Sequence, residues 1–209
     1  MPRRLILAAV LLTLLMLGMA AIWILSHQLD KGRPSDAALF EQWARGAESP
    51  EVAAFRRFLA QEGVADVVPL AELLRSDARW RRCDLAPFAV PPRGQWRNIA
   101  PTLRYVRDHV VPQVGRVRVV SAYRDPVANR CFGGASESRH LRFAALDLEP
   151  VASLERPELV ARLCRLHARN GQRFAVGLGI YKGVRFHIDT AGYRRWGHDF
   201  RAATSPCAQ

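Results

Sequence analysis

Apolar residues recur at helical spacing in several stretches of the chain. This pattern predicts amphipathic helices over residues 36–45, 51–61, 70–75, 99–111 and 156–170. Strand patterns, rich in β-branched and apolar residues, fall over residues 116–121, 175–181 and 184–189, with a further short apolar run at 144–148. Because helices and strands follow one another without a repeating strand–helix–strand order, the predicted fold is α+β, with a small mixed sheet and flanking helices.

The longest apolar stretch lies at the N-terminus. Residues 5–25 carry no charge and follow Arg3 and Arg4. At ~1.5 Å per residue, a helix of this length spans a hydrocarbon core of about 30 Å. The basic flank favours a cytoplasmic N-terminus. A cleaved signal peptide is the alternative, but the run exceeds the roughly 7 to 15 apolar residues typical of one, so we expect one N-terminal transmembrane helix that stays as an anchor.

The chain is strongly basic, with 31 Lys and Arg against 19 Asp and Glu and a net charge of +12. Such a charge favours anionic partners, including nucleic acid, anionic lipid or an acidic wall polymer. No zinc-finger spacing and no aromatic-laced basic motif accompanies it, so no nucleic acid is expected as a partner.

The cysteine count is even, which suits full pairing as disulfides in an oxidising compartment. Three connectivities are possible, and the sequence does not choose among them. A thiolate zinc site is disfavoured because no pair has the C-x-x-C spacing. The four residues are Cys83, Cys131, Cys164 and Cys207.

Candidate chemistry is concentrated between residues 121 and 147. His140 and Asp147 are seven residues apart, and Asp147 interrupts an apolar run. An ionised carboxylate in such a run costs several kcal/mol, roughly, without compensation, so we expect a cation or a metal beside it. Downstream, His187 and Asp189 alternate in a strand and therefore point to the same face. Together, His140, Asp147 and His187 form the two-histidine, one-carboxylate set typical of a catalytic zinc with an open fourth position.

The segment from Ser138 to Asp147 (SRHLRFAALD) resembles the Ser-x-His-x-x-Gly-x-Ala-x-Asp motif of the M15 zinc D-Ala-D-Ala peptidases, which act on peptidoglycan. The downstream segment GLGIYKGVRFHIDTAGYRRW is similar to the end of that domain, where the third zinc ligand lies. The resemblance covers about residues 84 to 200. Two positions depart from it. Phe143 replaces the motif glycine, and Val184 stands where some relatives carry a glutamate general base.

The remaining site residues have alternative roles. Asp189 is either the general base or a residue that orients His187 or Arg194. Arg124 suits a substrate carboxylate or a developing oxyanion, and its structural alternative is a pair with Asp125 or Glu137.

By the same resemblance, Ser138 is expected to bind near the ligand loop. Tyr181 and Trp196 are candidates to stack on a sugar or peptide, although aromatic residues near strand ends commonly serve packing.

The resemblance implies a Zn²⁺-dependent carboxypeptidase or endopeptidase acting on peptidoglycan peptides. With the N-terminal apolar run and the helical patterns that follow it, three segments are expected: an anchor (1–28), a linker with a helical lead-in (29–82) and a zinc peptidase-like domain (83–209). The expected location is the bacterial inner membrane, crossed once, with the catalytic domain in the periplasm. Two rival hypotheses are a non-catalytic cell-wall-binding module with a degenerate peptidase fold, and a structural protein that holds an anionic polymer.

Overall fold

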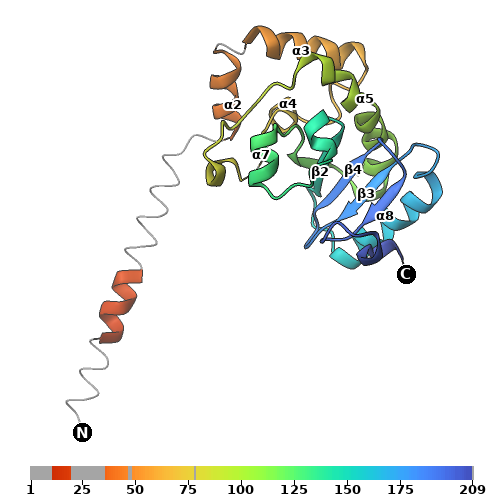
Figure 1. Ribbon diagram of the computed structural model, residues 1–209. Helices are drawn as coiled ribbons and strands as arrows, with labels where there is room; N and C mark the ends of the chain where they lie inside the picture. Colours follow the sequence, from red (N-terminus) through yellow and green to blue (C-terminus); the bar gives the residue numbers. More distant parts are fainter. Residues whose placement is uncertain (1–10, 20–35, 47–48, 78, 209) are drawn as a thin grey trace. The chain divides into compact units, whose positions relative to one another are not determined.

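The computed structural model describes the chain except for residues 1–10, 20–35, 47–48, 78 and 209 (Figure 1). Of the predicted anchor at 5–25, only residues 11–19 are described, and these are helical; the rest lies outside the described residues. In the part of the chain that is described, no helix has both the length and the apolar character needed to cross a membrane.

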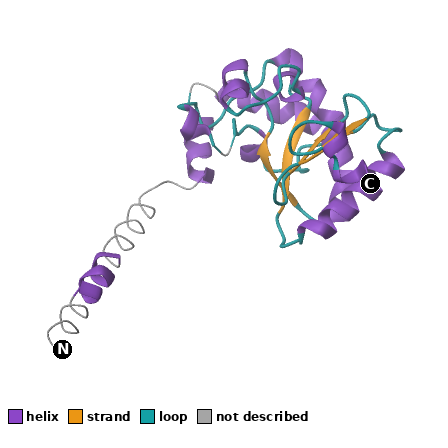
Figure 2. Cartoon of the chain, turned by 60° about the horizontal axis from the view of Figure 1, so that its bottom comes forward, coloured by secondary structure: helices purple, strands orange, loops and turns teal. Residues whose placement is uncertain are grey.

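The chain divides into two units, Met1–Gln42 and Trp43–Gln209, and helix α2 (Asp36–Ala44) contains the boundary. The second unit holds the sheet and most of the helices. Its α-helices are α3 (Ser49–Gln61), α4 (Leu70–Leu73), α5 (Trp96–Tyr105), α6 (Val111–Val114), α7 (Pro126–Cys131) and α8 (Arg156–Asn170). The helices flank the strands, as Figure 2 shows, so the α+β prediction is confirmed for the described residues.

Five strands form one sheet in the order β1-β2-β4-β3-β5. They are β1 (Val117–Ser121), β2 (Ala145–Pro150), β3 (Gly177–Ile180), β4 (Phe186–Asp189) and β5 (Arg194–Trp196). The sheet is mixed, as predicted, because β3 and β5 are parallel while the other pairs are antiparallel. Strand β2 lies directly beside β4, which brings distant parts of the sequence together.

The predicted helix over 99–111 is interrupted. It begins earlier, at Trp96, and passes through a π-helical turn, Val106–Val110, before α6. Pro112 follows this turn and has no N–H to donate, which is consistent with the wider backbone spacing there. Helix α7 and strand β5, both short, were not predicted. The Asp125 side chain caps the start of α7, and Pro126 is its first residue.

All four cysteines form disulfides, Cys83 with Cys131 and Cys164 with Cys207. The predicted full pairing is therefore confirmed. The first disulfide ties the segment before the sheet to the end of α7, and the second ties α8 to the C-terminal segment.

Phe143 takes the left-handed backbone conformation that a glycine adopts easily, with φ of 50°. Its side chain is fully buried, with ring centroids 5.8 Å from Phe55 and 6.3 Å from Tyr123. The departure from the motif glycine thus keeps the backbone turn and adds a core side chain, which offsets the conformational cost of about 1–2 kcal/mol.

Candidate metal centre

Two neighbouring strands and one short turn carry the three candidate ligands. Asp147 on β2 and His187 on β4 are directly paired across the two strands. His140 lies in the 3₁₀ turn Arg139–Arg142, whose position is fixed by a hydrogen bond from the Arg124 backbone N–H to the His140 carbonyl (3.1 Å). All three side chains are buried.

One atom from each residue faces a common point. His140 Nε2 is 3.2 Å from Asp147 Oδ1 and 3.2 Å from His187 Nδ1, and the last two atoms are 3.1 Å apart. Ligands about 2.0 Å from a tetrahedral zinc ion lie about 3.3 Å from one another. The three donor atoms therefore already have the spacing of one face of a zinc site.

The outward nitrogen of each histidine has a partner that accepts a hydrogen bond. His140 Nδ1 donates to the carbonyl of Ala122 (2.6 Å), and His187 Nε2 donates to Asp189 Oδ2 (2.9 Å). With the protons placed there, the inward nitrogens of the neutral rings and Asp147 Oδ1 are all acceptors. Three acceptors at this spacing repel one another unless a cation lies between them, so the donor set fits a metal ion.

Asp189 is fully buried and has no free oxygen for substrate. Besides His187, it accepts hydrogen bonds from Arg194 (2.7 and 3.1 Å) and from the backbone of Ala191 (2.9 Å). Burial acts to raise the pKa of this carboxyl, but the hydrogen bond and charge of His187 together with Arg194 lower it. This geometry fits the orienting role for Asp189 better than the general-base role.

Gly177 provides the space that Asp189 occupies. A Cβ added at Gly177 would lie 2.3 Å from Asp189 Oδ2 and 2.9 Å from Arg194 Nη1. Gly177→Ala is therefore expected to displace Asp189 from His187 and to weaken zinc binding by about 10- to 100-fold. Competition with a chelator measures this, with Gly94→Ala as the control, because a Cβ added at Gly94 would meet no atom within 4 Å. Equal zinc affinities in the two variants would contradict the orienting role.

Arg124 is only 6% exposed and is held by three side chains. It donates to Asp147 Oδ2 (2.5 Å) and Ser121 Oγ (2.7 Å), and it lies 3.5 Å from Asp77. Neither of the expected structural partners, Asp125 and Glu137, binds it: Asp125 caps α7, and Glu137 lies near Arg142. Arg124 thus fixes the second oxygen of Asp147 and leaves Oδ1 toward the other ligands.

Charges at the centre keep Asp147 ionised. Burial acts to raise the pKa of the Asp147 carboxyl, but His140 and Arg124 hold it well below its ordinary value. Burial and the charge of Arg124 lower the pKa of His140, which favours the neutral ring that a metal requires. Burial also acts to lower the pKa of His187, but Asp147 and Asp189 raise it, so a metal at the centre would have to displace a proton from this ring when it is charged.

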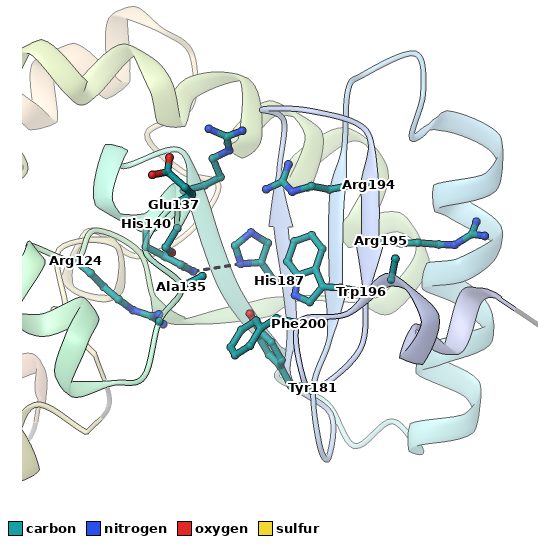
Figure 3. Close-up of a pocket in the computed structure, with 14 residues that line it drawn as sticks. Arg124, Ala135, Glu137, His140, Tyr181, His187, Arg194, Arg195, Trp196 and Phe200 are labelled. Atoms are coloured by element: carbon teal, nitrogen blue, oxygen red, sulfur yellow. Dashed lines mark hydrogen bonds between the residues drawn. The ribbon is translucent and has the colours of Figure 1, made fainter.

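A cavity of about 320 Å³ opens over the histidines (Figure 3). Three predicted binding residues, Ser138, Tyr181 and Trp196, line it together with Arg124. Trp196 lies beside His187, with ring centroids 5.0 Å apart, and its buried Nε1 has no hydrogen-bond partner among the described residues.

Several residues of the site were not predicted. Asp77 is fully buried and binds Arg79 (2.9 Å) as well as Arg124. Phe200 lines the cavity, and so do the cations Arg139 and Arg195. Asp77 lies in a segment with no motif, and no local pattern in the sequence marks it.

Comparison with known protein families places the chain beside the peptidases. The family model described as Peptidase M15 matches residues 71–189, which is more than half of the chain and includes every candidate ligand. No curated protein and no solved structure matches the chain.

Proposed function

The chain belongs to the peptidase M15 family, and on this premise we propose that it is a zinc-dependent peptidase that hydrolyses D-amino-acid-containing peptides of peptidoglycan. The bond cleaved is either the terminal one, as in a D-Ala-D-Ala carboxypeptidase, or an internal one. The observation that carries the proposal is the triangle of acceptor atoms from His140, Asp147 and His187, with edges of 3.1 to 3.2 Å. A zinc ion held there would supply a Lewis acid that polarises a peptide carbonyl and lowers the pKa of a water molecule to about 7.

The protein's own residues prepare the site in three ways. Ala122 and Asp189 hold the outward protons of the two histidines, and Arg124 holds one oxygen of Asp147. Arg139 lines the cavity and would attract the carboxylate of a peptide, while Arg194, which also lines it, is held by Asp189. Tyr181 and Trp196 supply apolar walls that limit access of water.

A periplasmic location with a single inner-membrane anchor is part of the proposal. Two disulfides support an oxidising compartment. The uncharged run at residues 5–25 supports attachment to the membrane.

A non-catalytic wall-binding module is the second candidate. Val184 offers no proton acceptor, and Asp189 is fully engaged. Among the described residues that line the first cavity, Glu137 is the one carboxylate, and its side chain is 85% exposed.

Peptide cleavage separates the two candidates. The full-length zinc-loaded protein is expected to release D-Ala, or an internal fragment, from peptidoglycan peptides ending in D-Ala-D-Ala. A chelator should stop the release and added zinc should restore it, as followed by mass spectrometry, while the L-Ala-L-Ala counterpart stays intact. Binding of these peptides without cleavage by the zinc-loaded protein would favour the wall-binding module.

A further inference from the structure

A second cavity, of about 530 Å³, adjoins the first, and Tyr181 lines both. The two cavities share four lining residues: Arg124, Gly134, Tyr181 and Phe200. His140 and His187 line the first cavity, and Asp147 lines the second. The candidate metal centre therefore lies between two arms of one cleft, and a peptide bound across it would extend into both.

The second arm, which we define by Arg79, Arg124, Lys182, Arg185 and Glu149, has an excess of positive charge. Its carboxylates are already paired, Glu149 with Arg118 and Arg185, and Asp147 with Arg124. Its arginines are paired as well, because Arg79 and Arg124 also bind Asp77, so the excess comes from Lys182. Lys182 is exposed at the turn between β3 and β4 and has no ion-pair partner among the described residues. An ammonium group at the mouth of a cavity favours an anionic ligand there.

Phe200 lies where the two arms meet. Its side chain is 53% exposed, and its ring packs edge-on against Tyr181 at 6.1 Å. Its φ of 63° is left-handed, a backbone conformation that bulky residues rarely adopt. An exposed aromatic ring held in a strained backbone at the rim of a cleft is typical of a ligand-contacting position.

We propose that the second arm binds a free carboxylate of the peptide substrate, on the opposite side of the metal centre from the first cavity. This inference rests on the proposed function and narrows its substrate to an acidic peptide. Lys182 makes the charge contact, and Phe200 contacts the intervening part of the peptide.

Matched peptides test the charge contact. Two labelled peptides end in D-Ala-D-Ala and differ only in a glutamate or a glutamine upstream. Their binding to the full-length zinc-loaded protein is recorded by stopped-flow anisotropy before turnover. The wild type is expected to prefer the glutamate peptide by roughly fivefold, the upper range for a partly exposed ion pair. Lys182→Glu should remove this preference. Arg97→Glu makes the same charge change at an exposed position of α5 that lines neither cavity, and it should keep the preference.

A second pair of variants tests the aromatic contact. Phe200→Ala is expected to weaken the binding of both peptides by a similar factor. Tyr193→Ala, at an exposed aromatic residue outside both cavities, should not.

The outcomes separate the two proposals. A glutamate preference that depends on Lys182, seen without any cleavage, supports carboxylate binding in the second arm and contradicts the proposed peptidase activity. Cleavage without the preference overturns the second arm and leaves the catalysis standing. Equal loss of the preference in Lys182→Glu and Arg97→Glu also overturns the second arm, and so does the absence of binding by either peptide.

Discussion

His140→Ala is expected to abolish stoichiometric zinc binding and to lower peptide cleavage by roughly a thousandfold or more. His140 supplies one of three converging donors, and its Nε2 lies 3.2 Å from each of the other two. Loss of a residue that only supports a ligand typically weakens metal affinity by about 10- to 100-fold. Loss of a ligand itself should weaken zinc affinity by more than this. Elemental analysis and a cleavage assay on the same preparation measure both effects.

The matched control is His109→Ala. His109 packs against Phe174, with ring centroids 4.7 Å apart, and is not among the donors at the centre. This variant should keep its zinc and its activity. Cleavage that persists in zinc-free His140→Ala would contradict metal-dependent catalysis, and so would an equal loss of zinc in both variants.

Arg124→Ala is expected to destabilise the fold by about 3–5 kcal/mol, the range for leaving a buried charge without its partner. Arg124 lies between Asp147 and Asp77, and both carboxylates are buried. The free energy of unfolding, from reversible denaturation of metal-depleted protein, isolates this effect from zinc binding.

Arg118→Ala is the control for a lost arginine. Arg118 pairs with Glu149 at the surface, where its side chain is 61% exposed, so about 1 kcal/mol or less is expected. Similar losses of unfolding free energy in the two arginine variants would show that the buried pair stabilises the fold no more than the surface pair does.

The contribution of the Arg124–Asp147 pair to the stability of the fold depends on pH, because it requires an ionised Asp147. Because the pKa of Asp147 is lowered in the folded protein, this contribution is complete above the ordinary value of about 3.9. It is lost as the pH falls through the lower, folded value. In Arg124→Ala the pKa of Asp147 should rise toward its ordinary value, so acidification should remove less stability from this variant than from the wild type.

The candidate ligands could be chosen from the sequence because their signals are local. The spacing of His140 and Asp147 forms part of a motif, and the alternation of His187 and Asp189 follows from strand geometry. The pairing of Asp147 with His187 could not be predicted, because strand register depends on contacts across the sheet.

The roles of the surrounding residues were harder to predict. The sequence identifies Arg124 as a cation but does not show that it is buried between Asp77 and Asp147. The Ala122 carbonyl, which fixes the His140 ring, has no side-chain signal at all. Such supporting contacts come from backbone groups and from distant segments, so they become visible only when the chain is folded.

X-ray absorption at the zinc edge of the purified protein tests the proposed metal centre most directly. We predict one zinc per chain, bound by nitrogen and oxygen at about 2.0–2.2 Å, with the scattering pattern of two imidazole rings and no sulfur. A zinc-free protein that still cleaves peptides would contradict this prediction, and so would a zinc ion with sulfur ligands at about 2.3 Å.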